Sequence, residues 1–532
     1  MPETKFLYGA SIQGIQSFIF QTNKLKEIVG GSELVEEICT TSFYEFIDPD
    51  GKGEEDSNII ISAAGNIKFI ANEGLCRRLV RDFPKLVLEK APGVTISQAV
   101  VKIDEELTLA EQISQLEEKL KAERNRPAKP QEIGFMGLER ARRTGGVAVK
   151  TKKRRGKEIV FCESTDKKDE VVVRRPNSFE MVSHTKLFYK ISGLMQPPKE
   201  ITLEVEDLCK GHKNSWIAVV HADGNGLGNI LQALGQKLRG QDFSKSKAAF
   251  RQFSLALDKA TQAAAREAFA DVFKEPRNYT SEGRYPIRPI ICGGDDITFI
   301  IRADIALRYT DVFLHAFEKQ SKIYLNEALA TYGVDTFSEG ITACAGIAFV
   351  KESYPLHYAL HLAEDLCKDA KKMVKSGERI PIRANGIPES ALAFYKVQES
   401  FTDKINSLKE RTLLASQGDK KLDFYYGPYL LDDLKILNER LEILKQEVDN
   451  AQGQTKAIGK LRKVVSDCFR DFNIAKFNLM RMEQVNSELF KALELKDEVE
   501  KLGRVEQGNE GEKSQLLDLI SLHGFNYGTR EN

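Results

Sequence analysis

One order of secondary-structure elements is predicted twice along this chain of 532 residues. In residues 1–123 the hydrophobic pattern predicts a strand, a helix, a β-hairpin, a helix, a strand and a final helix. The same order is predicted again in residues 214–400. A chain that repeats a β-α-β-β-α-β unit is expected to build one fold twice. We therefore predict an α+β protein with two ferredoxin-like domains.

The two copies differ where their strands end. In the second copy, a strand of mostly apolar residues ends at Asp223, and a hairpin turns at Gly293–Asp296. In the first copy, Ser11 stands in place of Asp223, and Ala63–Asn66 stands in place of that turn. Only the second copy therefore carries acidic side chains at both points.

The residues outside the two copies are predicted to form two further regions. Residues 124–213 contain prolines, glycines and a basic run, which predicts a mobile insert followed by a connecting helical segment. Residues 401–532 show helical periodicity and are predicted to form an all-helical C-terminal domain. The basic run is a candidate RNA contact, although a solvated loop explains its composition equally well. Its residues are Lys150, Lys152, Lys153, Arg154, Arg155 and Lys157.

The composition excludes several classes of protein. Lysine and arginine number 78, as do aspartate and glutamate, so the formal net charge is zero. This balance excludes a uniformly basic nucleic-acid coat and an acidic disordered chain. No apolar run reaches the ~20 residues that cross a bilayer, and we expect no signal peptide. The eight cysteines are scattered, with none at CxxC spacing, so we expect no zinc and a cytoplasmic location.

The acidic residues of the second copy form the candidate catalytic site. A strand–helix–hairpin unit brings a strand end and a hairpin turn together in one sheet. The carboxylates of Asp223, Asp295 and Asp296 would then repel one another unless a cation joined them. Hard oxygen ligands suit Mg²⁺ or Mn²⁺, which can activate a hydroxyl, orient a triphosphate and stabilise departing pyrophosphate. Asp295 and Asp296 are expected to be exposed at the turn.

Glycines around these acids are candidates for binding a nucleotide. Gly293 and Gly294 lack a Cβ atom, which permits a tight turn and a close approach of a ligand to the backbone. Gly224, Gly226 and Gly228 would leave backbone N–H groups free to face phosphate oxygens.

Lys371 lies on a predicted helix that is rich in charged residues. Either its ammonium reaches the β- and γ-phosphates of a nucleotide, or it belongs to a solvated helix face. Charge density alone favours the solvated face.

Several short motifs, in a fixed order, resemble those of a known family. The loop Ala222–Gly228, the hairpin Gly293–Asp296, the segment Ala345–Ala348 and the helix Ala363–Lys371 are similar to the catalytic palm of the large subunit of type III CRISPR effector complexes. This CRISPR polymerase family is related to GGDEF and adenylyl cyclase palms. Residues 12–20 resemble its first palm, and the residues from Gly427 onward resemble its C-terminal helical domain.

The resemblance implies an enzyme that polymerises ATP. The 3′-hydroxyl of one ATP would attack the α-phosphate of another, pyrophosphate would leave, and ring closure would give a cyclic oligoadenylate messenger for antiviral signalling. Guide and target RNA and other complex subunits are the implied partners, and no membrane is involved.

The resemblance also implies roles for single residues. Asp223 and Asp295 would be metal ligands, Gly224 would offer a backbone carbonyl, and Asp296 would support them. Lys371 would contact phosphates. The first palm, which lacks acids, would bind an acceptor nucleotide near Asn66.

Three features depart from the family pattern. Many members have an HD nuclease domain, but this chain begins at the first palm and has no His-Asp dipeptide, so we expect no DNA cleavage. Many have a four-cysteine zinc insert, but the basic stretch up to Pro176 holds only Cys162. Where many have a second Asp in the Asp-Gly-Asp loop, this chain has Asn225. Its neutral carbonyl is predicted to lie beside the metal, where the lost charge would favour Mn²⁺ over Mg²⁺.

Two other functions remain open from the sequence. One is a palm scaffold without turnover inside an RNA-guided complex. The other is a stand-alone cyclic nucleotide synthase that needs no CRISPR RNA and assembles as a homo-oligomer. The intact Gly293–Asp296 turn favours the enzyme, because drift would be expected to erode it, as at Ala63–Asn66.

Overall fold

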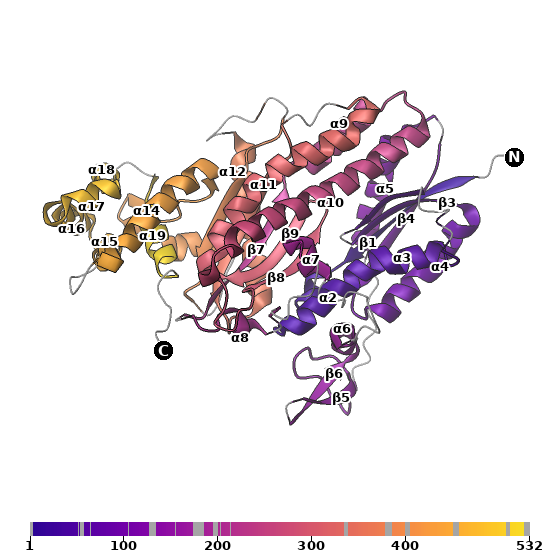
Figure 1. Ribbon diagram of the computed structural model, residues 1–532, viewed down its shortest axis with the longest axis horizontal. Helices are drawn as coiled ribbons and strands as arrows, with labels where there is room; N and C mark the ends of the chain where they lie inside the picture. The colour runs from indigo at the N-terminus through magenta and orange to yellow at the C-terminus, as the bar shows by residue number, and fades with distance from the viewer. Residues whose placement is uncertain are drawn as a thin grey trace.

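The computed structural model describes most of the chain and arranges it as two palms and a C-terminal region. The described residues are 4–51, 53, 58–63, 65–104, 106–126, 135–154, 156–173, 186–194, 201–202, 204–212, 214–334, 339–377, 383, 386–399, 405–450, 457–506 and 511–525. Figure 1 shows the first palm at one end, the C-terminal helices at the other, and the second palm between them. Within these residues, no helix combines the length and apolarity needed to cross a membrane.

The first palm is a four-stranded antiparallel sheet with the strand order β2-β3-β1-β4. The central strand β1 is buried from Leu7 to Ile12, as a strand between two neighbours and under helices requires. Thr108 and Glu111 form a capping box that starts the helix after β4. The elements are β1 (Lys5–Gln13), α1 (Ile15–Ile19), α2 (Leu25–Glu37), a π-helical turn (Ile38–Ser42), α3 (Phe43–Ile47), β2 (Ile59–Ala63), β3 (Asn66–Asn72), α4 (Glu73–Lys90), β4 (Thr95–Lys102) and α5 (Leu109–Arg124).

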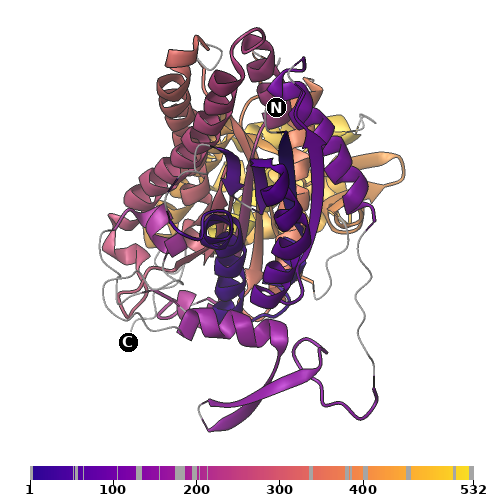
Figure 2. The same ribbon diagram turned by 90° about the vertical axis from the view of Figure 1, so that its right-hand side faces the viewer.

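The insert between the palms contains regular structure that the sequence analysis did not predict. The basic run lies in a β-hairpin of β5 (Ala148–Arg154) and β6 (Lys157–Cys162), and α6 (Glu163–Val173) follows directly. Figure 2 shows this hairpin projecting below the first palm. The prediction of a segment without regular structure was therefore wrong here, because acids of α6 neutralise part of the basic run. Two short helices, α7 (Lys186–Ser192) and α8 (Val205–Leu208), lead to the second palm.

The second palm repeats the first palm's strand order and extends it. Its sheet has the order β14-β11-β10-β7-β9-β8, in which β8-β9-β7-β10 corresponds to β2-β3-β1-β4. The long helices α10 and α11 pack along each other beside this sheet (Figure 1). The elements are β7 (Trp216–Gly224), α9 (Leu227–Lys237), α10 (Phe243–Phe273), a 3₁₀ turn (Pro276–Asn278), β8 (Ile287–Gly293), β9 (Asp296–Arg302), α11 (Ala303–Leu329), a second 3₁₀ turn (Ala330–Tyr332), β10 (Ala343–Lys351), α12 (Leu356–Ser376) and β11 (Ala391–Lys396).

The C-terminal region is mainly helical but also contains short strands. A three-stranded sheet, β12-β13-β15, packs among its helices, and β14 joins the sheet of the second palm. The all-helical prediction missed these strands because each has only two to four residues. The elements are α13 (Ile405–Leu408), a π-helical turn (Lys409–Leu413), β12 (Leu414–Gln417), β13 (Lys420–Asp423), β14 (Tyr429–Leu430), α14 (Leu431–Asn450), α15 (Ala457–Cys468), α16 (Phe472–Val485), α17 (Ser487–Ala492), α18 (Leu495–Glu506), β15 (Glu512–Lys513) and α19 (Leu516–His523).

The two palms meet where α2 of the first packs on β8 of the second. The Ser32 hydroxyl donates to the backbone carbonyl of Ile290 across this contact. Beside it, the carboxyl group of Glu33 faces the guanidinium of Arg288, and both side chains are buried. The α+β fold of two linked palms is therefore confirmed, and the next question is what this contact places around the acids.

Candidate active site at the acidic strand end

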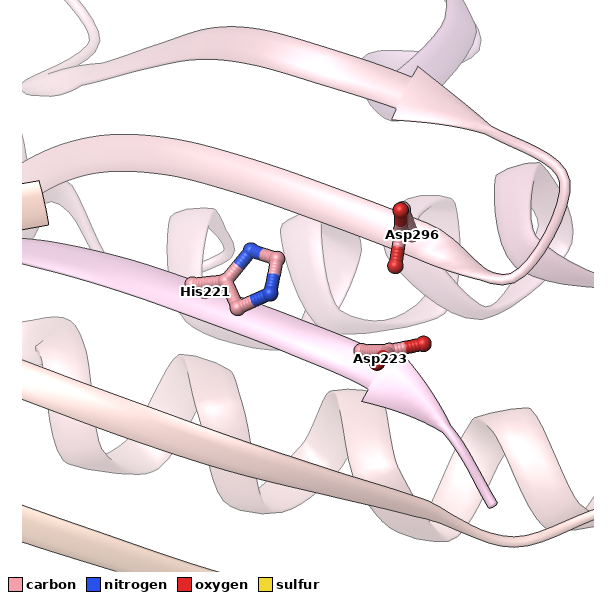
Figure 3. A group of neighbouring side chains, drawn as sticks. All are labelled: His221, Asp223 and Asp296. Carbon is pink, nitrogen blue, oxygen red and sulfur yellow. The ribbon is translucent and has the colours of Figure 1, made fainter. Parts of the chain in front are cut away.

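The strand register brings Asp223 and Asp296 side by side. Strands β7 and β9 are antiparallel, and Ala222 pairs with Ile297, so the next step along the ladder sets Asp223 opposite Asp296. Oxygen atoms of both carboxylates and a ring nitrogen of His221 all lie within 4.8 Å of one another. Figure 3 shows these three side chains together at the ends of the two strands. The structure therefore brings the end of β7 and the hairpin turn together, as the sequence predicted.

Asp295 lies over the glycine that ends β7. A Cβ atom built on Gly224 would stand 2.8 Å from both Cβ and Oδ2 of Asp295. Real side-chain atoms do not approach so closely, so this position needs glycine. The turn itself is made by Gly294, whose φ of +63° lies in the left-handed region that glycine tolerates. Thr261 fixes the turn by donating to the Gly294 carbonyl at 2.5 Å.

The acids are more enclosed than the sequence predicted. Asp295 and Asp296 are half-buried, not exposed, because helices of both palms surround the turn. Burial, followed by the charge of Asp223, raises the pKa of Asp295 to about 7 and raises the pKa of Asp296 well above its ordinary value. Negative charge that has too few counter-charges favours a bound cation.

A cation of the protein already touches this cluster. Lys371 of α12 forms an ion pair with Asp223, and its Nζ donates to the carbonyl oxygen of Gly224 at 2.7 Å. Burial alone would lower the pKa of Lys371, but the Asp223 carboxylate outweighs it and the pKa is raised. Lys371 is thus part of the site and not of a solvated helix face. Its ammonium binds the same oxygens that were predicted to hold a metal, so these oxygens suit a cation.

His221 is a site residue that the sequence analysis missed. Burial lowers its pKa to about 4, against the opposing charge of Asp223, so the imidazole is neutral at pH 7. Its Nδ1 lies 3.0 Å from the hydroxyl oxygen of Thr298, which fixes the ring. A neutral imidazole held through one nitrogen can offer the other to a metal ion. With two carboxylates beside it, the group fits a divalent cation.

Asn225 has hydrogen-bond partners that the sequence analysis did not predict. Its side chain is fully buried, and its amide donates to the hydroxyl of Thr342 at 3.0 Å and to the Glu389 carbonyl at 3.2 Å. The backbone N–H of Asn225 also donates to the Thr342 carbonyl at 2.8 Å. These bonds anchor the loop to the residues just before β10 and β11, and a place of the Asn225 carbonyl beside the metal stays a prediction. The partners come from distant parts of the chain, which the local motif cannot show.

The remaining predicted residues surround the acids or lie apart from them. Gly226 caps the start of α9 with a φ of +70°, and Gly228 lies in the first turn of that helix. Gly293 lines a cavity with Asp296. Asn66 lies in the first palm, where it accepts a hydrogen bond from Ser11 at 3.1 Å. The contacts of these residues with nucleotide phosphates stay predictions.

The cavity lies between the two palms and has a volume of about 260 Å³. The second palm contributes Cys292, Gly293 and Asp296, and the connecting helix α7 contributes Leu187. Lining residues of the first palm come from β1, α1, α2 and the turn between β1 and α1; they are Ile12, Gly14, Ile15, Gln16, Ser17, Ile19, Ser32, Val35 and Glu36. Asp296 of the second palm therefore lines a cavity whose opposite wall is the first palm.

The basic run lies in the insert and is partly neutralised. Lys150 pairs with Asp166 and Glu170, and Lys152 pairs with Asp166 and Asp169. Lys153 and Lys157 are exposed, as is the paired Lys150, and Lys153 lies 3.8 Å from a carboxylate oxygen of Glu158. Arg155 lies outside the described residues. An RNA contact of this run stays a prediction.

Comparison with known proteins identifies the second palm. Residues 216–379 match the sequence model of the family described as Cas10/Cmr2, second palm domain. No curated protein matches the chain in sequence.

Solved structures share the wider fold. A crystal structure of a Csm1–Csm4 cassette in complex with cA3 is similar to this protein. The alignment covers 99% of this chain and 70% of the matched chain, at 13% identity and a TM-score of 0.51. For the cassette in complex with pppApApA, the alignment covers 98% of this chain and 70% of the matched chain, at 14% identity and a TM-score of 0.52. Csm1 from T. onnurineus aligns with 98% and 70%, at 14% identity and a TM-score of 0.51. The chain therefore carries a second palm domain of the Cas10/Cmr2 family, set in a two-palm fold that it shares with Csm1.

Proposed function

We propose that this protein is a metal-dependent nucleotidyltransferase that converts ATP into oligoadenylates, including cyclic ones. The observation that carries the proposal is the cluster of His221, Asp223 and Asp296, of which Asp296 lines a cavity between the two palms. A nucleotidyl transfer needs two nucleotides, and two opposing palms offer one wall to each. The Csm1–Csm4 structures in complex with cA3 and with pppApApA support this class of ligand.

The chain's own groups account for cation binding and orientation. His221, Asp223 and Asp296 would hold Mg²⁺ or Mn²⁺, with the Gly224 carbonyl available once Lys371 releases it. When bound, the divalent ions would activate the attacking hydroxyl and stabilise charge on the phosphates. Lys371, displaced from Asp223, would remain within reach of the triphosphate as a mobile positive charge.

The reaction forms one bond and breaks another. The 3′-oxygen of one ATP bonds to the α-phosphorus of the second, the bond to the β-phosphate oxygen breaks, and pyrophosphate and the hydroxyl proton leave. The first palm, with Ser11 and Asn66 in place of acids, would hold the acceptor nucleotide. The same transfer between the two ends of one oligoadenylate would close it into a ring.

The protein would act in the cytoplasm as the palm subunit of an RNA-guided complex. The solved assemblies of Csm1 with Csm4 support a partner subunit, and guide and target RNA would control synthesis. RNA binding through exposed lysines of the insert, Lys153 and Lys157, belongs to this proposal.

Product analysis tests the proposal directly. The purified chain is incubated with ATP and either Mg²⁺ or Mn²⁺, with and without guide and target RNA, and products are separated by chromatography. Oligoadenylates together with pyrophosphate support the enzyme. Synthesis without RNA would indicate a stand-alone synthase. ATP binding without product, in both metals and with RNA present, would overturn the proposal in favour of a silent scaffold.

A further inference from the structure

A second cavity lies at the opposite end of the second palm's sheet from the acids. It has a volume of about 690 Å³ and is lined by Trp216, Lys351, Lys396 and Arg462, among others. At about 3.3 Å per residue, the seven steps along β7 from Trp216 to Asp223 span about 23 Å. This cavity is therefore separate from the proposed active site.

Strand ends and the C-terminal helices build this cavity together. Lys351 ends β10 directly opposite Trp216, which begins β7. Lys396 ends the neighbouring strand β11, and Arg462 comes from α15 of the C-terminal region. Ser521 of α19 completes the wall, and its backbone carbonyl accepts a hydrogen bond from Lys396 at 3.3 Å.

The tryptophan ring positions two of the cations. The Nζ atoms of Lys351 and Lys396 lie 4.4 and 4.8 Å from the centroid of the Trp216 ring. Lys396 also lies 4.6 Å from the centroid of Phe525, which is buried. Aromatic faces hold an ammonium without neutralising its charge. Both lysines are thus held at the cavity by the ring and keep their positive charges.

Within the described part of the chain, no ion pair neutralises the cations of this cavity, although the charge of Glu352 acts on Lys351. Among the residues that the structure describes, Lys351, Lys396 and Arg462 have no carboxylate oxygen within 4.0 Å. The lining contains one acid, Glu399, and it forms an ion pair with Arg411. Burial, followed by the charges of Arg462 and Lys351, lowers the pKa of Lys396 to about 8. The three cations therefore destabilise one another when no anion is present.

We propose that this cavity binds a phosphate group of a nucleotide or of a nucleic-acid backbone, at a site distinct from the catalytic acids. A phosphate has several oxygen acceptors around one centre and can meet donors that converge from three elements. Two ammonium groups and one guanidinium supply such donors from two strand ends and one helix. The volume also lies in the range of small-ligand sites, so the cavity can admit more than the phosphate alone.

The single tryptophan of the chain gives a local reporter for this site. Trp216 is the only tryptophan, so a change in its fluorescence reports on the ring that carries both lysines. The full chain is titrated with inorganic phosphate, with ATP and with a single-stranded RNA oligomer of mixed sequence. We expect a saturable change in fluorescence with at least one of them. Equal responses to phosphate and ATP would assign a free phosphate, whereas a much tighter response to RNA would assign a phosphodiester backbone.

Variants separate this site from other phosphate contacts. Arg462→Ser leaves both lysines on the ring and should weaken the response about tenfold, while Lys351→Met with Arg462→Ser should abolish it. Lys463→Ala, which removes an exposed charge from the same helix, should leave the response unchanged. For RNA, each lost contact should reduce the slope of log affinity against log salt by about 0.7. The proposal is overturned if no ligand gives a saturable response, or if the double variant binds as the native chain does.

Discussion

The two palms place their glycine on opposite sides of the same strand pair. In the first palm, Ile12 lies opposite Gly65. In the second palm, the glycine is Gly224 and the residue opposite it is Asp295. The registers make these pairs equivalent, because Ser11 pairs with Asn66 just as Asp223 lies opposite Asp296. A Cβ atom on Gly65 would lie 2.3 Å from Cδ1 of Ile15, and one on Gly224 would lie 2.8 Å from Asp295, so in each palm a neighbouring side chain occupies the space over the glycine. The first palm fills that space with an apolar group and the second with a carboxylate. The same backbone therefore serves as a wall in one copy and as a cation site in the other.

The helix that packs on each sheet, α5 in the first palm and α12 in the second, shows the same difference between the palms. A Cβ atom on Gly9, the equivalent of His221, would lie 2.7 Å from Leu116 of α5, so the first palm has no space for a side chain there. Arg124, the last residue of α5, donates to Ser11 at 3.4 Å, and Lys371, within the last two turns of α12, reaches Asp223. A basic side chain at this place is common to both palms. The acids and His221 are particular to the second palm, so of the two strand ends only that one presents the ligands of the proposed metal site.

The strongest test of this comparison removes the acids. Changing Asp295 and Asp296 together to Ala should reduce oligoadenylate synthesis by at least about a thousandfold, because the cation loses its negatively charged neighbours. Thermal unfolding should show an unchanged or higher melting temperature, since both carboxyl groups are enclosed beside another acid. Product yield and the melting temperature are measured on the same preparation.

The equivalent change in the first palm is the matched control. Ser11→Ala with Asn66→Ala alters the paired positions of the other sheet. It should shift apparent ATP affinity or product length and keep the dependence on divalent metal. Undiminished synthesis by the acid variant, or loss of metal dependence in this control, would show that the two palms do not divide the work in this way.

A smaller effect is expected from filling the space over Gly224. Gly224→Ala places a methyl group 2.8 Å from Asp295, so that carboxylate must move. Displacing a group that takes part in the reaction should lower the rate about 10- to 100-fold while the fold remains intact. Gly74→Ala in the first palm, where the nearest atom to the new methyl is 3.7 Å away, is the control. Steady-state rates of pyrophosphate release distinguish them, and an equal effect of both would contradict the packing argument.

The sequence could predict the repeat and the acids but not how enclosed the acids are. Element order and the Gly293–Asp296 turn are local signals, and the strand register confirms their equivalence with the first palm. His221 was missed because it lies inside an apolar run. The alternation of a strand would have found it, since residues two apart share a face and His221 precedes Asp223 by two. Asn225 could not be placed, because Thr342 and Glu389 approach it only in the folded chain.

The next test concerns the choice of metal. Because a nitrogen ligand favours Mn²⁺ over Mg²⁺, His221→Asn should lower the ratio of product made with Mn²⁺ to product made with Mg²⁺ by about tenfold. Thr298→Val, which removes the hydroxyl that fixes the ring, should lower the ratio less. Metal titrations of all three forms give the ratio. If His221→Asn reduces synthesis equally in both metals, the imidazole does not choose the ion.

The last prediction concerns the stability of the interface that joins the palms, where a change should affect synthesis least. Burial raises the pKa of Glu33 from 4.5 to about 8, against the opposing charges of Arg288 and Lys186. The folded chain thus keeps a proton there that the unfolded chain loses, so the free energy of unfolding should fall as pH rises from about 4.5 to 8. Glu33→Gln mimics the protonated carboxyl group and should remove a fall on the order of a few kcal/mol. Denaturant unfolding at pH 5 and pH 8 measures it. An equal pH dependence in both forms would mean that Glu33 is ionised between the palms, and that the contact of α2 with β8 is an ion pair with Arg288.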